Sequence, residues 1–302
     1  MYTDFYDKLK LIISDEKILL DEPMSKHTTF RIGGNADMFV SPQIEQVPQI
    51  VALAKEYEVP VTIIGNGSNL LVGDKGIRGL VLSFGKDADS VQVDGSCIIA
   101  GAGALLSKIA AEALKHSLTG FEFAAGIPGT LGGALVMNAG AYGGELKDVL
   151  ISVKVLTMEG KIEELSAAEL DLSYRHSCIL EKGYIVLEAI IELQPSEEEA
   201  IREMMADFKN RRIEKQPLEY PSAGSTFKRP EGHFAGKLIQ DAELRGYTVG
   251  GAQVSEKHCG FVINKGGATA ADVCKLIADV KEKVYEQFQV EMEPEVKMIG
   301  EF

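Results

Sequence analysis

Two glycine-rich stretches hold the residues best suited to binding a large ligand through the backbone. The first, residues 126–145, contains seven glycines among Ala, Leu, Val, Ile and Met, with almost no charge. We expect it to be irregular and buried, because exposed glycine-rich linkers usually carry Ser, Lys or Glu. Glycine lets a backbone lie directly against a flat ligand. The stretch predicts a cradle for a large planar or phosphate-bearing cofactor, although a glycine-rich crossing of two packed elements would have the same composition.

The second stretch is the turn Gly65-Asn-Gly-Ser-Asn-Leu-Leu71, which follows a β-branched run over 59–64. Successive N–H groups of such a turn can form an anion-binding nest, and Ser68 and Asn69 add side-chain donors. The turn is therefore a candidate phosphate site at the end of a strand. An ordinary Asn-Gly hairpin turn fits the same residues equally well.

A third glycine pattern, Gly101-Ala-Gly-Ala-Leu-Leu106, is only a weak match to a dinucleotide fingerprint. Leu106 stands where the third glycine should allow close packing of helix and strand. We therefore interpret residues 101–106 as a tight turn from a strand into a helix.

Hydrophobic periodicity predicts a mixed α/β chain around these stretches. A helix follows Ser41-Pro42, and a boundary falls near Gln194-Pro195. The other expected elements are a hairpin over 149–165, a long strand over 184–193, a helix over 234–244, a strand over 261–264 and an amphipathic helix over 269–288.

Composition narrows the classes of partner. The formal net charge of -14 argues against nucleic acid or an anionic membrane, so an anionic ligand needs a local basic cluster. The first residues do not form a signal peptide, and no apolar run is long enough to span a bilayer. The four cysteines and five histidines are dispersed, which predicts a cytoplasmic protein with reduced thiols and no metal site.

Six motifs occur in the order found in one known family. They are Gly65-Asn-Gly-Ser-Asn-Leu-Leu71, Gly126-Ile-Pro-Gly-Thr-Leu-Gly-Gly-Ala134, Asn138-Ala-Gly140, Tyr174-Arg175, Ser222-Ala-Gly-Ser-Thr-Phe-Lys228 and Glu293-Pro-Glu-Val296. From about residue 27 to its end the chain resembles the UDP-N-acetylenolpyruvoylglucosamine reductase (MurB) family. The compact interval between Pro230 and Glu295 resembles the shorter type, which lacks extra third-domain elements.

The resemblance implies an α+β fold of the FAD-binding vanillyl-alcohol-oxidase (PCMH) type, with two α+β subdomains and a third α+β substrate-binding domain. Residues 1–84 would form the first subdomain, with 291–302 returning to it. Residues 85–195 would form the second subdomain, and residues 196–290 the substrate-binding domain.

The implied reaction is a reduction in cytoplasmic peptidoglycan precursor synthesis. NADPH reduces non-covalently bound FAD, and reduced FAD then delivers hydride to the enolpyruvyl group of UDP-N-acetylglucosamine enolpyruvate, giving UDP-N-acetylmuramate. No nucleic acid, membrane insertion or obligatory protein partner is implied. The turn at 65–71 suits the FAD diphosphate and the cradle suits the flavin ring. The expected FAD contacts are Gly65, Asn66, Gly67, Ser68, Asn69, Leu70, Gly126, Ile127, Pro128, Gly129, Thr130, Gly133, Ala134, Asn138, Ala139 and Gly140.

Three residues match the family's catalytic positions. Arg175 would hold and polarise the substrate carboxylate, Ser225 would donate a proton to carbon, and Glu295 would lie near the developing enolate. Burial and like charge should favour the neutral, donating form of such a carboxyl group. Without the resemblance, a surface ion pair, a turn-forming serine and a solvated glutamate would explain these residues.

Lys215, Lys228 and Arg229 are the candidate contacts for the substrate diphosphate, with Tyr174 and His258 as weaker candidates. A solvated charged face is the alternative for the two lysines.

Two rival functions fit parts of the same sequence. A flavin-dependent oxidase of the same fold often tethers FAD through a histidine, but no histidine lies between His27 and His116. A nucleotide-sugar sensor on a degenerate flavin scaffold should have lost its reactive residues, yet Arg175, Ser225 and Glu295 are all present.

Overall fold

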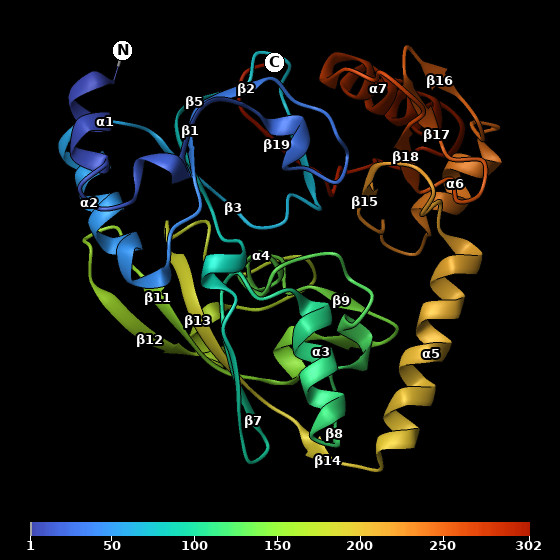
Figure 1. Cartoon of the computed structure of the whole chain (residues 1–302). Coiled ribbons are helices and arrows are strands. Elements are labelled where there is room, and N and C mark those ends of the chain that lie inside the picture. The colour runs from blue at the N-terminus through green and yellow to red at the C-terminus, as the bar shows by residue number, and fades with distance from the viewer. Residues whose placement is uncertain (1) are drawn as a thin grey trace. The chain divides into compact units, whose positions relative to one another are not determined.

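The computed structural model describes residues 2–302 (Figure 1). The α-helices are α1 (Thr3–Leu9), α2 (Val47–Glu56), α3 (Leu106–Lys115), α4 (Leu131–Val136), α5 (Glu198–Lys215), α6 (Ala235–Asp241) and α7 (Ala270–Phe288). The first ten strands are β1 (Ile18–Pro23), β2 (Asn35–Val40), β3 (Val61–Ile64), β4 (Leu70–Val72), β5 (Ile77–Ser83), β6 (Val91–Asp94), β7 (Cys97–Gly101), β8 (Leu118–Thr119), β9 (Gly140–Ala141) and β10 (Gly144–Glu145). The others are β11 (Leu150–Leu156), β12 (Ile162–Ser166), β13 (Ile185–Glu192), β14 (Gln194–Pro195), β15 (Ser222–Ser225), β16 (Thr248–Val249), β17 (Ala252–Val254), β18 (Phe261–Asn264) and β19 (Lys297–Ile299).

The chain divides into two compact units, each with its own hydrophobic core. Unit 1 contains the chain up to Leu20, Met38–Asn66 and Gly79–Arg211. Unit 2 contains Asp21–Asp37, Gly67–Arg78 and Arg212–Phe302. The finer division into two FAD-binding subdomains and a substrate domain stays a prediction.

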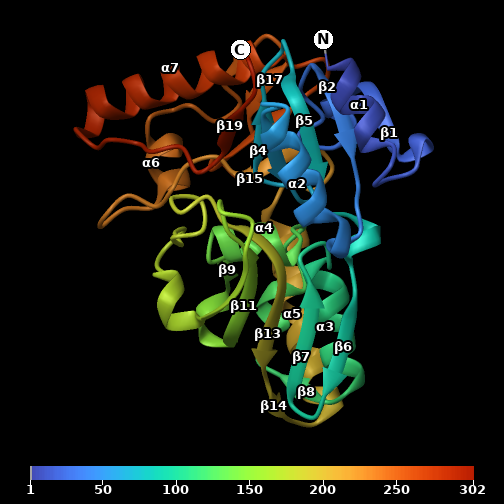
Figure 2. The same ribbon diagram turned by 90° about the vertical axis from the view of Figure 1, so that its left-hand side faces the viewer.

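Unit 1 is built on an antiparallel sheet of order β12-β11-β13-β7-β6. The β11–β12 pair confirms the expected hairpin, and β13 confirms the long strand. Helix α3 packs against β6 and β7 (Figure 2). Its buried face carries Leu106, Ile109, Ala110 and Ala113, so the helix contributes directly to the core.

The turn from β7 into α3 needs glycine for packing. A Cβ atom at Gly101 would lie 2.5 Å from the Ala88 carbonyl oxygen, and one at Gly103 would lie 2.4 Å from the Gly85 carbonyl oxygen. These contacts leave no room for side chains. They confirm the interpretation of residues 101–106 as a tight strand-to-helix turn.

Unit 2 has a four-stranded antiparallel sheet of order β15-β18-β17-β16, packed with α7. Thr269 caps α7 by accepting a hydrogen bond from the Asp272 N–H, and the Asp74 carboxylate accepts from the Ala270 and Ala271 N–H groups at 2.7 and 3.0 Å. Bonds of this kind satisfy the unpaired donors of a helix N-terminus. They fix the start of the helix at the expected position.

The glycine turn after β3 is not part of a hairpin. Strand β3 pairs in parallel with β5, in a sheet of order β1-β2-β5-β3, whereas β4 pairs in parallel with β19. The chain therefore changes sheets between Ile64 and Leu70. This pairing excludes the Asn-Gly hairpin as an explanation of the turn.

Residues 126–145 are more regular and more exposed than expected. They contain α4 and the short β9–β10 pair, and Gly126, Pro128 and Gly133 are not buried. The prediction of an irregular, buried stretch was therefore wrong in part. Its high glycine content obscured the helix, which buries one face through Leu131, Ala134 and Leu135.

Candidate functional site

The cradle residues of unit 1 are fixed by hydrogen bonds to a second loop and to the α3 turn. The Asn66 side chain donates to the Pro128 carbonyl oxygen at 2.7 Å. The Leu106 N–H donates to the Gly129 carbonyl oxygen at 3.1 Å, and the Leu131 N–H donates to the Ala104 carbonyl oxygen at 2.8 Å. These bonds bring Asn66 and the cradle together within one unit.

Thr130 carries a buried hydroxyl group without a hydrogen-bond partner. The residue is 3% exposed, and its Oγ1 atom has no partner within residues 2–302. A Cβ atom on Gly65 would lie 2.1 Å from this Oγ1 atom, so a side chain at position 65 would displace the hydroxyl. A buried hydroxyl group that lacks a partner costs free energy. The Thr130 hydroxyl is therefore a candidate donor to a bound group.

Gly132 and Gly133 are neighbours in α4, but Gly132 is buried and Gly133 is exposed. A Cβ atom on Gly132 would lie 3.1 Å from the Ala102 Cβ atom, so this glycine serves packing. A Cβ atom on Gly133 would have the Thr130 Oγ1 atom as its nearest neighbour, at 3.7 Å, and this glycine is exposed. Nothing in the described chain needs glycine at 133. A flat ligand lying against the backbone would need it, and the unpaired hydroxyl beside it fits a ligand with polar edges.

Asn138 joins the cradle to the loop that carries Arg175. It is fully buried, and its Nδ2 atom donates to the Glu145 carboxylate at 2.7 Å and to the Ser173 carbonyl oxygen at 3.1 Å. Its Oδ1 atom accepts from the Lys147 N–H at 3.0 Å. Both amide hydrogens are thus used inside the protein. Asn138 positions its neighbours, and direct contact with a cofactor stays a prediction.

Arg175 lies at the tip of a tight turn. Ser173 and His176 exchange backbone hydrogen bonds of 3.2 and 3.1 Å, which leaves Tyr174 and Arg175 as the two central residues. Arg175 has a φ of 56°, its guanidinium lies 5.0 Å from the Tyr174 ring centre, and it donates to the Gly140 carbonyl oxygen at 3.5 Å. The turn thus holds a cation beside the end of the cradle.

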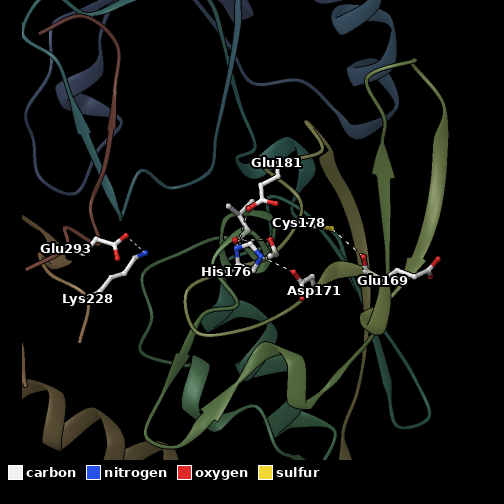
Figure 3. Close-up of polar contacts among 9 residues, drawn as sticks. Glu169, Asp171, His176, Cys178, Glu181, Lys228 and Glu293 are labelled. Carbon is white, nitrogen blue, oxygen red and sulfur yellow. Dashed lines mark hydrogen bonds and ion pairs between the residues drawn. The ribbon is translucent and has the colours of Figure 1, made fainter. Parts of the chain in front are cut away.

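His176 fixes the base of this turn through carboxylates. Its Nε2 atom lies 3.3 Å from the Asp171 carboxylate, and its Nδ1 atom lies 3.8 Å from the Glu181 carboxylate (Figure 3). The Ser177 hydroxyl donates to the Val136 carbonyl oxygen at 2.9 Å. The loop is therefore anchored on both sides of Arg175.

In unit 2, Ser225 lies at an irregularity in the sheet. It ends β15 opposite Phe261 of β18, and the register shifts between Ser222 and Ser225. Gly224 has a φ of 76°, which glycine adopts without strain. Bulges of this kind redirect a side chain at a strand end. Ser225 is exposed there, with its hydroxyl available to a ligand.

Glu295 lies beside Ser225 because two distant segments pair. The Glu295 N–H donates to the Thr226 carbonyl oxygen at 2.8 Å, and Phe227 forms an isolated bridge with Pro294. The Asn69 side chain donates to the Glu295 carbonyl oxygen at 3.2 Å. Unit 2 therefore brings together Ser225, Glu295 and Asn69, which the sequence separates by up to 226 positions.

The basic candidates differ in their surroundings. Lys228 forms an ion pair with Glu293 (Figure 3), and its N–H donates to the Glu293 carbonyl oxygen at 2.9 Å. Arg229 donates to the His233 carbonyl oxygen at 3.4 Å. Lys215 is the exposed last residue of α5. The pairing of Lys228 was not apparent from sequence, because Glu293 is 65 positions away.

His258 is held in one tautomer. Its Nδ1 atom accepts a hydrogen bond from the Gly260 N–H at 3.1 Å, so its proton resides on Nε2. Burial lowers the pKa of His258 below its usual value. The ring packs edge-on against Phe261, which lies opposite Ser225. His258 is thus a neutral donor near Ser225.

Metal sites and membrane spans are both absent from residues 2–302. Their His, Cys, Asp and Glu side chains include no group that could hold a metal ion. None of the described helices is long and apolar enough to cross a membrane.

Comparisons with known proteins cover nearly the whole chain. A family model described as the C-terminal domain of UDP-N-acetylenolpyruvoylglucosamine reductase matches residues 216–299, and an FAD binding domain model matches residues 36–166. The UDP-N-acetylenolpyruvoylglucosamine reductase of Agathobacter rectalis is 61% identical over 297 residues, which cover 94% of this chain and 95% of that protein. The one from Clostridium perfringens is 53% identical and covers 99% of this chain and 98% of its own length.

Solved structures agree with the sequence comparisons. UDP-N-acetylenolpyruvylglucosamine reductase from Thermus caldophilus has a TM-score of 0.79 and 33% identity, covering 93% of this chain and 97% of that one. An alkyldihydroxyacetonephosphate synthase matches with a TM-score of 0.51 and 21% identity over 65% of this chain and 41% of the other. The second likeness concerns the fold alone. Together with the FAD binding domain match, these structures confirm the expected α+β FAD-binding fold.

Proposed function

Because the chain belongs to the UDP-N-acetylenolpyruvoylglucosamine reductase family, we propose that it reduces UDP-N-acetylglucosamine enolpyruvate to UDP-N-acetylmuramate with NADPH. It is a flavin-dependent oxidoreductase of peptidoglycan synthesis, and its cofactor is FAD. FAD supplies the hydride transfer that links the two substrates. We place the reaction in the cytoplasm.

Thr130, Gly133 and Asn66 are proposed to hold the cofactor. The open backbone at Gly133 would lie against the flavin ring, and the Thr130 hydroxyl would donate to a polar atom of the cofactor. Asn66 would keep the loop at Pro128 in place through its 2.7 Å hydrogen bond. The chain thus supplies shape and donors, and the cofactor supplies the redox chemistry.

The observation that carries the proposed mechanism is the pairing of residues 226–228 with 293–295, which sets Glu295 beside Ser225. Ser225 is proposed to give its proton to the substrate carbon, and Glu295 to donate a hydrogen bond to the enolate formed there. Arg175 is proposed to bind the adjacent carboxylate. Donors positioned in advance stabilise charge as it develops, which is the main demand of this reduction.

The basic residues are proposed to bind the substrate diphosphate. Lys215, Lys228 and Arg229 supply positive charge, and His258 supplies a neutral N–H donor. Tyr174 is proposed to contact the same substrate from the turn that carries Arg175. A local cluster is needed because the chain as a whole carries a net charge of -14.

The test is an anaerobic assay of the purified holoenzyme. Acid precipitation should release yellow FAD into the supernatant, and NADPH should bleach the bound flavin. UDP-N-acetylglucosamine enolpyruvate should restore the oxidised spectrum and gain the mass of two hydrogens. UDP-N-acetylglucosamine, which lacks the double bond, is the matched control. A flavin that the enolpyruvyl compound does not reoxidise would refute the proposal.

A further inference from the structure

Phe234 is a large aromatic side chain on the surface of unit 2, directly before α6. It is 62% exposed, although an Arg229 guanidinium carbon lies only 4.0 Å from the ring centre. Single exposed apolar residues are common and need no explanation alone. The features that need explanation here are the contact of this ring with Arg229 and its place on the loop that follows Ser225.

The loop that carries Phe234 is internally tied. The Arg229 Nε atom donates to the His233 carbonyl oxygen at 3.4 Å, and the His233 N–H donates to the Pro230 carbonyl oxygen at 3.1 Å. Gly232 has a φ of 73° in this turn. The Phe234 carbonyl oxygen accepts from the Lys237 and Leu238 N–H groups at 3.0 and 3.1 Å. The ring is therefore presented from an ordered loop, which limits the entropy lost when a ligand stacks on it.

Both ends of this loop connect to segments that lead to Ser225. At one end the Lys228 N–H is bonded to the Glu293 carbonyl oxygen, and four residues from Ser225 to Arg229 span at most about 14 Å. At the other end a Cβ atom on Gly236 would lie 3.1 Å from the Gly260 nitrogen. The Gly260 carbonyl oxygen in turn accepts from the Thr226 N–H at 2.8 Å, next to Ser225.

We propose that Phe234, held by Arg229, is a stacking platform for the uracil ring of the nucleotide-sugar substrate. The inference rests on the proposed function, because it assumes that this substrate reacts beside Ser225. An exposed aromatic face with cations next to it suits a ligand that joins a heteroaromatic base to phosphates. Arg229 supplies the cation in contact with the ring, Phe234 supplies the face, and Lys228 adds a second positive charge one residue before Arg229.

The absence of tryptophan from the chain permits a direct binding test. Phe234→Trp introduces a single indole, whose fluorescence a stacked base quenches, and Phe288→Trp on α7 is the matched control at a site that is 37% exposed. Uridine diphosphate should quench the indole of the first variant and leave the control unchanged, and pyrophosphate should quench neither. Equal quenching by pyrophosphate, or quenching by NADP⁺ but not by uridine diphosphate, would overturn the proposal.

Kinetics give an independent measurement. Phe234→Ala should raise the KM for the nucleotide sugar by roughly 5- to 100-fold, the range expected for loss of one base stacking contact. Phe234→Tyr should stay within about 2-fold of the unchanged enzyme, because it keeps the aromatic face. An unchanged KM in Phe234→Ala would overturn the proposal.

The same variants separate failure of this inference from failure of the proposed function. FAD content and the rate of bleaching by NADPH should be normal in Phe234→Ala, since the ring is assigned only to the nucleotide sugar. If the unaltered enzyme reduces the enolpyruvyl substrate and Phe234→Ala binds it equally well, only the platform is refuted. If the unaltered enzyme does not reduce it, the proposed function itself is refuted.

Discussion

At the scale of single residues, Thr130 carries a buried hydroxyl group that is unpaired within the described chain. Its hydroxyl is buried without a partner in residues 2–302, although it lies within reach of backbone that glycines at 65 and 133 keep open. Leaving a buried polar group unpaired costs about 1–3 kcal/mol. We infer that the bound cofactor accepts a hydrogen bond from this hydroxyl and so removes the unfavourable free energy.

Thr130→Val tests this inference, since valine keeps the shape of threonine and lacks the hydroxyl. The variant without FAD should unfold at the same or a higher temperature. Its Kd for FAD should rise about 10- to 100-fold, as expected for loss of a hydrogen bond to a charged or strongly polar group. Thermal unfolding of the FAD-free protein and its titration with FAD, followed by flavin fluorescence, measure the two effects. An unchanged Kd would mean that the hydroxyl does not contact the cofactor.

Lys228 differs from Thr130, because its ammonium group already has a partner. It forms an ion pair with the Glu293 carboxylate. The pair is only partly exposed on the lysine side, with 25% of the Lys228 side chain accessible. Because the Glu293 side chain is 69% exposed, we expect this pair to contribute only about 0–1 kcal/mol to stability, as solvent-accessible ion pairs usually do. We therefore expect the positive charge of Lys228 to act in substrate binding.

Lys228→Ala should raise the KM for the nucleotide sugar several-fold, and the effect should be larger at low salt than at high salt. Glu293→Gln is the matched variant, because it leaves the ammonium group unpaired and should keep or lower the KM. Steady-state kinetics at two ionic strengths measure both. If the two variants change the KM equally, Lys228 merely holds the 293–295 segment in place.

Helix α4 shows how one element combines packing and binding. Its face with Leu131 and Leu135 is buried in the core, and Gly132 lies against Ala102. Gly133 is exposed next to Thr130. The same short helix therefore supports unit 1 on one side and presents open backbone on the other.

Gly133→Val should remove FAD without unfolding the chain, because its side chain would occupy the space proposed for the ring. The stability of the FAD-free protein should change by less than about 1 kcal/mol, since the site is exposed and helical. Gly132→Val should instead lower that stability by about 1–3 kcal/mol through overpacking. Thermal unfolding and flavin content distinguish the two. Full flavin content in Gly133→Val would contradict the placement of the cradle.

Elements that depend on local pattern were predictable from the sequence. The helix beginning after Thr269, the strand Phe261–Asn264 and the hairpin of β11 and β12 were expected at nearly these positions. Each has its own cap, turn or hydrophobic period, so its neighbours in sequence suffice to define it. Helix α4 was missed because glycine is a poor helix former and two glycines occupy its interior.

Contacts between distant segments were not predictable from local pattern. The parallel pairing of β4 with β19, the ion pair of Lys228 with Glu293 and the bond between Thr226 and Glu295 join residues far apart in the chain. The family resemblance identified Ser225 and Glu295 as candidate catalytic residues. Only the fold accounts for their proximity. The hydrogen bond from Asn138 to Ser173 was likewise not predictable, because Ser173 lies 35 positions away.

At the scale of the molecule, the proposed catalytic residues come from both compact units. Arg175 belongs to unit 1, and Ser225 and Glu295 belong to unit 2. The residues proposed to hold the cofactor, Asn66, Thr130 and Gly133, all belong to unit 1. An overall net charge of -14 leaves recognition of an anionic substrate to local groups on these loops.

The most direct test of the central claim separates the two half-reactions in Ser225→Ala. Because the proton is needed only when the substrate carbon is reduced, stopped-flow absorbance should show nearly normal bleaching of the flavin by NADPH. Reoxidation by UDP-N-acetylglucosamine enolpyruvate should be slower by at least about 10²- to 10⁴-fold, the usual contribution of a positioned general acid. Reoxidation at the normal rate would remove Ser225 as the proton donor and contradict the account.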